Sequence, residues 1–400
     1  MSSSAAADLR TDSLATGSPA GEWTDPKRRA YLQALIVPSL PFAAGGLVAL
    51  TGWNVFWWFG PFMLFAVMPL LDQAFGLDTA NPPEELSKEL DDDRWYRWCT
   101  YLYLPLQFAS LVWAARLWGQ GDLSFLSSLG LALTVGCVAG IAINTAHELG
   151  HKRPALEQWL SKISLSQTGS GHFFIEHNRG HHQKVSTPDD PASSRMGESF
   201  WAFLPRTVIG SLRSGIHLER ERCERAGRSF WSVRNDVLNA WAMTVVLFGG
   251  LVLAFGVQVL PWLVVQAVFG FSLLEVVNYI EHYGLLRRRK DNGRYERCQP
   301  EHSWNASNVA SNLVLYQLQR HSDHHAFPTR RYQTLRHFDD VPQLPTGYAG
   351  MIVAAAVPPL WRRLMDQRVL DHYDGDLARV NVHPPARRRL EARFGDTVAA

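Results

Sequence analysis

The stretch Asn144-Thr145-Ala146-His147-Glu148-Leu149-Gly150-His151-Lys152 ends a long apolar run and carries two histidines one helical turn apart. Three further histidine clusters follow it. Together the four clusters contain nine histidines: His147, His151, His177, His181, His182, His282, His321, His324 and His325. If His177 and His181 also lie on a helix, they share one face as His147 and His151 do. One transition-metal ion takes at most about six ligands, so nine imidazoles predict at least two ions.

Six apolar stretches are each long enough to cross a bilayer, which needs about 20 residues. They are residues 31–50, 53–71, 95–118, 129–146, 237–256 and 260–279. Pro61 and Pro69 predict a kink in the second stretch. We therefore expect an all-α integral membrane protein with six transmembrane helices and a cytoplasmic helical cap that carries the histidine clusters.

The chain divides into three predicted parts. Residues 1–26 are rich in Ser, Ala, Thr and Gly, which is typical of a disordered tail and not of a cleaved signal. Residues 27–366 form the six-span domain, and residues 367–400 a C-terminal cytoplasmic tail. Between and after the spans we expect helices over 198–225 and 308–325.

Basic residues gather on one side of the predicted topology. They precede the first span at Lys27–Arg29, follow the fourth at Lys152 and Arg153, and follow the sixth at Arg287–Lys290. Positive residues favour the cytoplasm, so both termini and all four histidine clusters should face it. The net charge of +2, without a basic tract interleaved with aromatics, argues against binding nucleic acid.

The histidine pattern allows several kinds of metal site. The run His147 to His151 satisfies HExxH, in which Glu148 would be the general base of a zinc protease, but this leaves the other clusters unexplained. Glu148 to His151 also fits the ExxH of carboxylate-bridged di-iron bundles, for which no convincing second copy lies near a span. A non-catalytic metal-binding membrane protein is a third alternative. A histidine-dominated pair of ions in a membrane favours iron and oxygen chemistry on a substrate dissolved in lipid.

Several motifs together resemble the membrane-bound histidine-rich di-iron superfamily, which contains fatty acid desaturases, hydroxylases and alkane 1-monooxygenases. The motifs are Asn144–Lys152, His172–His177, Asp190–Arg195, Asn278–Leu285, His302–Asn305 and Leu318–His325. Within the superfamily the chain is most similar to the alkane 1-monooxygenases, over residues 31–365. The stretch Asn278–Leu285 argues against the rival reading, an acyl hydroxylase or desaturase that acts on lipid-linked chains.

The resemblance implies that the nine histidines are catalytic residues that bind two iron ions. The implied reaction is O2-dependent hydroxylation of the terminal methyl of a medium- or long-chain n-alkane to the 1-alkanol. Electrons would come from rubredoxin, itself reduced by an NAD(P)H-dependent reductase, at the bacterial inner membrane. One position departs from the family pattern, Phe327, where relatives often carry a more polar residue.

Three further sets of residues are expected to support this reaction. Acceptors that fix the second imidazole nitrogen are sought among Glu148, Glu176, Asp190, Glu281 and Asp323. A substrate channel is predicted along Trp57, Leu64 and Met68. A docking surface for acidic rubredoxin is predicted at Arg287, Arg288, Arg289, Lys290, Arg320, Arg330 and Arg331.

Overall fold

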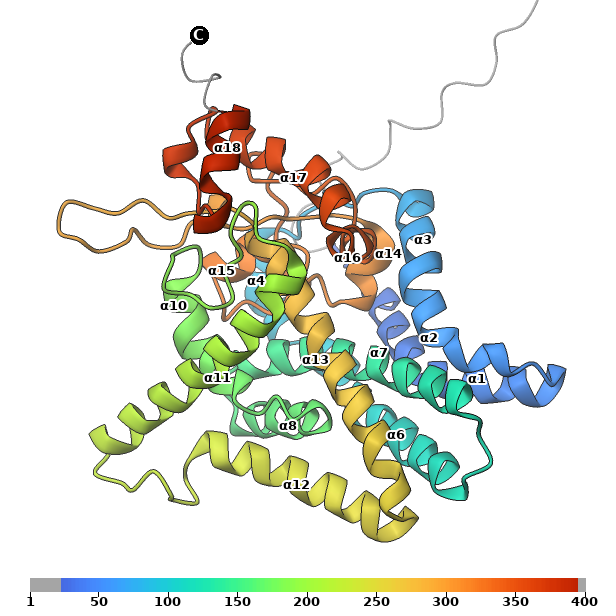
Figure 1. The fold of residues 1–400 in the computed structure, drawn as a ribbon. Helices are drawn as coiled ribbons and strands as arrows, with labels where there is room; N and C mark the ends of the chain where they lie inside the picture. The colour runs from blue at the N-terminus through green and yellow to red at the C-terminus, as the bar shows by residue number, and fades with distance from the viewer. Residues whose placement is uncertain (1–22, 395–400) are drawn as a thin grey trace, which may run out of the picture.

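The computed structural model describes residues 23–394, which form helices joined by loops and isolated β-bridges (Figure 1). The all-α prediction is confirmed for these residues. The predicted disordered tail, residues 1–26, lies mostly outside them. Five helical segments are long and apolar enough to cross a membrane: Ala30–Thr51 (ending in α1, Ile36–Thr51), Asn54–Phe75, α7 (Phe125–Gly150), α12 (Asp236–Phe255) and Val257–His282 (mostly α13, Leu260–His282).

The third predicted span is not one long apolar helix. Residues 94–120 form two helices, α5 (Arg94–Tyr101) and α6 (Tyr103–Gln120), with the break at Leu102. Pro105 explains the break, because it has no N–H to donate to the carbonyl of Tyr101 and its ring crowds that carbonyl. α6 also carries Gln107 and Arg116, which lower its mean hydropathy. The described residues therefore contain five candidate spans and not the expected six.

Proline shapes the second span. The segment Asn54–Phe75 passes through η2 (Asn54–Trp58), α2 (Phe59–Phe62), a π-helical turn (η3, Met63–Val67) and α3 (Met68–Phe75). The π turn ends at Val67, two residues before Pro69, which cannot donate to the carbonyl of Phe65. The kink expected from Pro61 and Pro69 takes the form of this widened turn.

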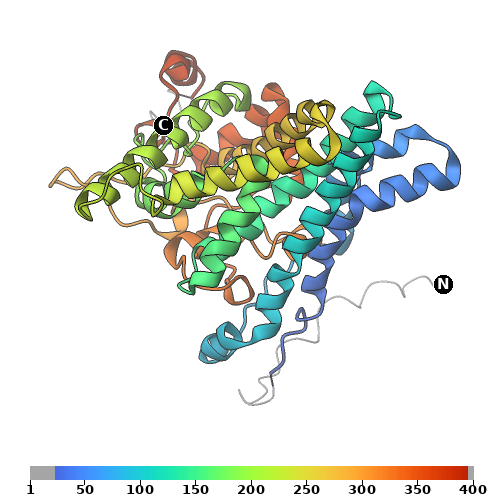
Figure 2. The same ribbon diagram turned by 90° about the horizontal axis from the view of Figure 1, so that it is seen from below.

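α7 is the central helix, and α13 packs along it (Figure 1). Gly136 and Gly140 on α7 face α13, and Gly270 on α13 faces α7. A Cβ on Gly140 would lie 2.8 Å from Leu273 Cδ1 and 3.2 Å from the carbonyl oxygen of Gly270. Small residues four apart allow two helix backbones to approach closely, as is common between membrane helices. In Figure 2, α1 and α6 run beside α7 on its other side.

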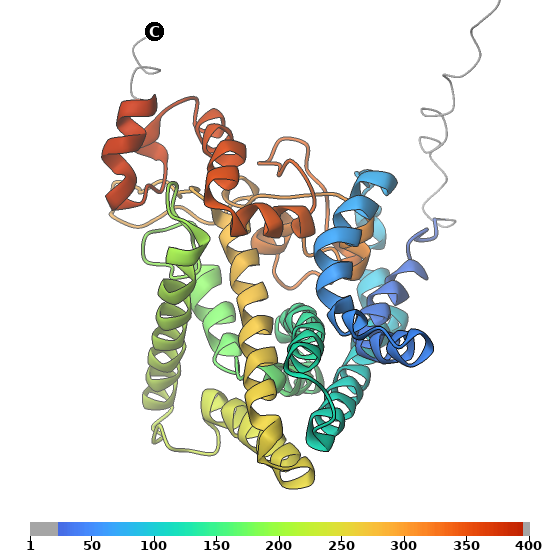
Figure 3. The same ribbon diagram turned by 45° about the vertical axis from the view of Figure 1, so that its right-hand side comes forward.

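The helices called the cap below come from three places: residues 76–93, the segment between α7 and α12, and the residues after α13. They are α4 (Ser87–Asp92), α8 (Ala155–Leu165), α11 (Phe200–Arg225), α14 (Val309–Val314), α15 (His321–Ala326), α16 (Tyr348–Ala356), α17 (Pro358–His372) and α18 (Arg387–Phe394). Figure 3 shows α13 running from the bundle into this cap. Residues of α13, α16, α17 and α18 share the largest hydrophobic cluster, which contains Leu390 and Phe394.

The single helix expected over 308–325 is wrong. Its place is taken by α14 and α15, separated by Tyr316 and Gln317 in the left-handed conformation at φ 50° and 56°. The backbone N–H of Gln317 donates to Asn312 O at 2.8 Å, and its side chain donates to the hydroxyl of Tyr31 at 3.1 Å. These tertiary contacts hold a turn that non-glycine residues rarely adopt.

The glycine contact between α7 and α13 predicts the effect of a larger side chain. Gly140→Val should separate the helices and lower the free energy of unfolding by about 1–3 kcal/mol through overpacking. Because α7 carries His147 and α13 carries His282, bound metal should fall as well. Thermal unfolding and metal analysis of the purified protein measure both effects. Gly249→Val on α12 is the control, since its added Cβ meets no atom within 4 Å; equal losses in the two variants would contradict the prediction.

Candidate metal centre

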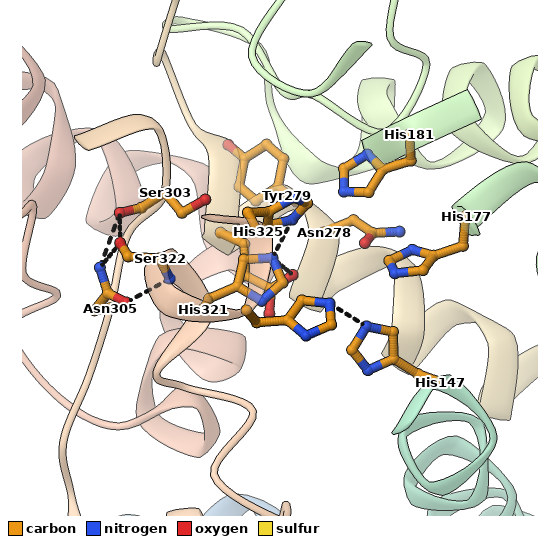
Figure 4. Close-up of polar contacts among 12 residues, drawn as sticks. His147, His177, His181, Asn278, Tyr279, Ser303, Asn305, His321, Ser322 and His325 are labelled. Carbon is orange, nitrogen blue, oxygen red and sulfur yellow. Dashed lines mark hydrogen bonds and ion pairs between the residues drawn. The ribbon is translucent and has the colours of Figure 1, made fainter. Parts of the chain in front are cut away.

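The structure gathers all nine clustered histidines and divides them into two adjacent groups. Figure 4 shows His147, His177, His181, His321 and His325 of these groups. The first group is His147, His151, His177, His182 and His324, and the second is His181, His282, His321 and His325. Within each group the candidate ligand atoms lie within 4.8 Å of one another. The rings of His182 and His325, one from each group, have centroids 4.4 Å apart. The cage therefore has two compartments, as the count of imidazoles required.

Four short segments deliver these rings. His147 and His151 lie at the end of α7, and His282 is the last residue of α13. A π-helical turn (η6, His177–His181), between α9 (Phe173–Glu176) and α10 (His182–Lys184), carries the second cluster. The fourth segment is α15 in the cap, which carries His321, His324 and His325.

The π turn changes the pairing expected from the sequence. His177 and His181 were expected to act together, but they point into different groups, and the partner of His177 is His182, with the Nε2 atoms 3.1 Å apart. A π-helical turn is wider than an α-helical turn, so residues five apart come to one face. α15 is divided in a similar way, because His324 joins the first group while His321 and His325 join the second.

The spacing of the nitrogens fits metal ligation. The Nε2 atoms of His147 and His324 are 2.9 Å apart, those of His324 and His182 3.2 Å, and those of His321 and His325 2.9 Å. Imidazole nitrogens bind such ions at about 2.1 Å, so two neighbouring ligands at right angles lie about 3 Å apart. Both ring nitrogens of His282 and the Nε2 of His181 are buried without a hydrogen-bond partner among the described residues. Orphaned buried nitrogens that converge in this way are what a cation would satisfy.

The cage also favours the neutral, coordinating form of imidazole. Burial, followed by the proximity of neighbouring imidazoles, holds the pKa of His177, His182 and His324 well below the ordinary value of 6.5. The same holds for the pKa of His321 and His325. A neutral ring offers a lone pair to a metal ion without first losing a proton.

Two of the five expected acceptors contact a histidine. Asp190 accepts from Nδ1 of His181 at 2.9 Å, which leaves the Nε2 of that ring for metal. The hydroxyl of Ser193 donates to the same carboxylate at 2.6 Å. Glu281 Oε2 lies 3.1 Å from Nε2 of His321, while the hydroxyl of Tyr348 donates to its Oε1 at 2.9 Å. Asp190 thus orients His181 of the second group through the second ring nitrogen, as expected of such an acceptor. Glu281 faces the same Nε2 of His321 that faces His325, so it does not fix the second nitrogen of that ring.

The other three expected acceptors have different surroundings. Glu148 forms an ion pair with Lys152 at 3.1 Å, and Asp323 pairs with Arg336 at 2.7 Å. Both carboxylates therefore fasten the cap and do not fix an imidazole. Glu176 is buried beside Gly180, and burial, reinforced by the charge of Asp190, raises its pKa to about 8.

The cap holds α15 in place through buried polar contacts. Asn305 Oδ1 accepts from the backbone N–H of Ser322 at 2.9 Å, and its amide donates to Ser303 O at 3.0 Å (Figure 4). Arg320, directly before His321, is buried and donates to Asp78 O at 2.9 Å and Leu335 O at 2.8 Å. These contacts hold the N-terminal end of the short helix that carries three of the histidines.

An apolar cavity of about 340 Å³ ends at the cage. Leu64 and Met68 line it, as predicted for the channel, whereas Trp57 packs in a separate hydrophobic cluster with Ala44 and Leu131. The polar residues that line the apolar cavity are Gln33, Asn144, His147, His177, Asn278, Glu281, Ser311, His321 and Tyr348. Ile36 and Phe75, which also line it, are 55% and 63% exposed. The cavity thus contacts both an exposed apolar rim, formed by these two residues, and imidazoles of the cage.

The seven basic residues expected at a docking surface divide into two kinds. Arg287, Arg320 and Arg331 are buried; Arg287 donates to two backbone carbonyls, and Arg331 pairs with Glu157 at 3.0 Å. They stabilise the fold and present no charge to a partner. Arg288, Arg289 and Lys290 are exposed on the loop that projects to the left in Figure 1.

Arg330 and Phe327 belong to the packing of the cap. Arg330 pairs with Glu84 and lies over the ring of Phe327, with 5.3 Å from the guanidinium carbon to the ring centroid. Arg336 lies over the same ring at 5.0 Å. Phe327, the departure from the family pattern, therefore supports the arginine that holds Asp323.

A third cluster, Glu296, Glu301 and His302, is explained without metal. The backbone N–H of Gln299 donates to Nδ1 of His302 at 2.9 Å, so the ring hydrogen lies on Nε2, which faces Glu296 at 3.4 Å. A ring in this tautomer has no lone pair to offer at Nε2.

Sequence reasoning missed two polar residues on α13. Glu275 and Asn278 precede His282 by seven and four residues, so the three share one face of the helix. Asn278 lines the apolar cavity beside the cage. Their spacing was the available signal, since polar residues within a membrane helix are seldom without function.

Comparisons with known proteins agree with this geometry. Residues 124–355 match the family described as fatty acid desaturase. The alkane 1-monooxygenase of Acinetobacter baylyi is 46% identical over 92% of this chain and 92% of its own length. Alkane 1-monooxygenase 1 of Alcanivorax borkumensis is 45% identical over 93% of this chain and 92% of its own length. The alkane 1-monooxygenase of Pseudomonas putida is 44% identical over 95% of each chain. Over nearly the whole length at this identity, the chain belongs to the alkane 1-monooxygenases, within the fatty acid desaturase family.

Proposed function

We propose that the protein hydroxylates the terminal methyl of medium- to long-chain n-alkanes, using O2 and two iron ions held by the two histidine groups. The observation that carries the proposal is the apolar cavity that ends at the imidazoles of His147, His177 and His321. An alkane has no polar group to recognise, so an enzyme can position its end only by the shape of an apolar cavity. The bound irons would supply the activation of dioxygen that an unreactive C–H bond requires.

The protein's own residues bind, orient and exclude water. Exposed Ile36 and Phe75 form an apolar rim through which a hydrocarbon can leave the lipid. Leu64 and Met68 line the chain's path, and Asn144 and Asn278 border its end beside the cage. This arrangement brings one methyl group to the centre and keeps bulk water away from it.

We place the centre on the cytoplasmic side of the bacterial inner membrane, with six spans and both termini in the cytoplasm. α6 would be the sixth span, because its 18 residues extend about 27 Å and it packs beside α1, α7 and α12. The basic residues Lys27, Lys152 and Arg288 then lie on the side that positive residues favour.

The structure disfavours the zinc-protease alternative. Glu148, the general base that such an enzyme needs, is bound to Lys152 and receives the backbone N–H of Tyr332 at 3.4 Å. The acyl desaturase or hydroxylase alternative is disfavoured by the relatives, which are alkane 1-monooxygenases over nearly their full length.

Electrons would come from rubredoxin, which we propose docks on the projecting loop. Arg288, Arg289 and Lys290 are exposed there, and the same loop is anchored to the cage segment because Arg287 donates to Gln183 O at 2.6 Å. An acidic partner is attracted to such a patch, and the attraction weakens with salt.

Metal analysis of ligand variants tests the proposed centre. His324→Ala removes a ligand of the first group and His325→Ala one of the second, so each should lower bound iron from about two ions per chain toward one. Rubredoxin-dependent conversion of octane through hexadecane, followed by chromatography, should fall at least about a hundredfold in both. His217→Ala, an exposed histidine on α11 outside the cage, should retain metal and activity. Full iron and activity in either cage variant would rule out the proposed centre.

Chain-length selection tests the cavity. Leu64→Trp adds bulk to the lining and should shorten the longest alkane that the enzyme hydroxylates, while short alkanes still react. Phe62→Trp is the matched control, because Phe62 is 58% exposed and does not line the cavity. Competition between alkanes of different length measures the effect; the same product range in wild type and Leu64→Trp would exclude Leu64 from the path.

Charge reversal tests the docking loop. Arg289→Glu together with Lys290→Glu should raise KM for rubredoxin roughly tenfold at low salt, with kcat at saturating rubredoxin retained. Steady-state kinetics over a series of salt concentrations measures the change, which should shrink as salt rises. Arg368→Glu on α17 is the control for net charge. A KM that does not respond to the double reversal would place docking elsewhere.

A further inference from the structure

A second, smaller cavity of about 100 Å³ lies against the cage and differs from the first in its chemistry. The two cavities share Phe173, His177, Leu274 and Asn278, so these side chains form the wall between them. The second cavity, called the polar cavity below, is lined by nine polar side chains: Thr168, Ser170, His172, Glu176, His177, His181, Ser211, Glu275 and Asn278. It touches one ligand from each histidine group, His177 and His181.

Glu275 is the carboxyl in the polar cavity that is remote in sequence from the metal ligands. It lies on α13, is 6% exposed, and its Oε2 accepts from the hydroxyl of Thr207 at 2.8 Å and the amide of Asn278 at 3.2 Å. Both donors are neutral. A carboxyl held by neutral donors can take up and release a proton without breaking an ion pair.

The polar cavity also has the properties of a water site. Glu176 Oε1 and His172 Nδ1 are buried without a hydrogen-bond partner among the described residues, and both residues line it. Its volume suffices for a few water molecules, each of which takes about 30 Å³ in the liquid. Five of its lining residues are partly exposed: Gly169, His172, Val208, Phe271 and Leu274. Phe271 and Leu274 belong to α13, and the other three mark the outer side of the cavity.

The proposed reaction needs protons as well as electrons. Written in full, R–H + O2 + 2 e⁻ + 2 H⁺ gives R–OH + H2O, with the electrons supplied by the one-electron donor protein. One oxygen atom enters the alkanol, and the other leaves as water after gaining the two protons. Hydrocarbon that fills the apolar cavity would displace water from it, so water could not carry protons along that path.

We infer that the polar cavity delivers these protons through water, with Glu275 as the relay between its outer side and the wall formed by His177 and His181. In each transfer an O–H bond of a protonated water breaks as one forms on the Glu275 carboxyl. The carboxyl O–H then breaks as the proton passes to water beside the ligands. The inference rests on the proposed function and gives each cavity one task, alkane in the first and protons in the second.

Glu275→Gln tests the relay, because glutamine keeps the size and polarity of the side chain but does not exchange the proton. With full-length, iron-loaded protein, we expect unchanged iron content and alkane affinity, and kcat at least about tenfold lower. The solvent deuterium isotope effect on kcat should rise, and more reductant should be consumed per alkanol formed. Glu275→Asp, which restores a carboxyl, should recover part of the rate.

Asp366→Asn is the matched control. Asp366 is also a buried carboxyl that accepts from a hydroxyl, that of Tyr283 at 2.9 Å, but it lines neither cavity. It should leave the rate, the isotope effect and the coupling of reductant to product as in wild type.

Ser211→Leu tests the water route while Glu275 stays intact, and its readout does not require turnover. In metal-free protein transferred to D2O, the infrared bands of Glu275, identified by their loss in Glu275→Gln, should shift more slowly in Ser211→Leu than in wild type. Ser211→Leu still tests the water route if Glu275→Gln loses iron, because the infrared bands of Glu275 can be assigned in metal-free protein.

The outcomes separate this inference from the proposed function. If wild type hydroxylates alkanes while Glu275→Gln has the same kcat, isotope effect and coupling, the relay is overturned and the function stands. Equal exchange rates in Ser211→Leu and wild type overturn the water route. If wild type with iron, rubredoxin and O2 yields no alkanol, the proposed function itself fails.

Discussion

The rest of the structure depends on one costly feature, nine imidazoles gathered in two compartments at the end of the helix bundle, seven of them buried and two, His151 and His182, partly buried. Neutral rings whose nitrogens lie 2.9–3.2 Å apart bring several lone pairs together, and a cation between them satisfies these lone pairs at once. The fold supports this arrangement from every side. The glycine contact sets α7 against α13, Asp190 fixes His181, and Asn305 and Arg320 hold α15.

The same arrangement separates the apolar cavity from the polar cavity. On one side of His177 and Asn278 lies the apolar cavity, with its exposed rim at Ile36 and Phe75; on the other lies the polar cavity with Glu275. A membrane enzyme that oxidises hydrocarbon must receive a substrate that avoids water and protons that require it. We propose that opposite faces of a single wall meet the two needs, and that the exposed loop Arg288–Lys290 offers a third approach, for the electron donor.

Much of this could be predicted from the sequence, because the signals were local. Of the six apolar stretches, five form helices that are long and apolar enough to cross a membrane. The histidine clusters contain all nine residues of the cage. Tertiary contacts decided the remainder. The π turn sends His177 and His181 to different groups, Pro105 divides the third stretch, and Tyr31 holds the turn at Tyr316 and Gln317. Arg320 and Arg331 were expected on a docking surface, but they are buried. Their partners, Asp78 and Glu157, are distant in sequence, so the pairs could not be predicted.

The account is tested most directly by an electron cryo-microscopy map of the iron-loaded, full-length protein with a long n-alkane. It predicts two separate metal densities, one among His147, His151, His177, His182 and His324 and one among His181, His282, His321 and His325. It also predicts an elongated density in the apolar cavity that runs past Leu64 and ends at the imidazoles. A single metal density, metal outside these groups, or an alkane bound away from the cavity would contradict it.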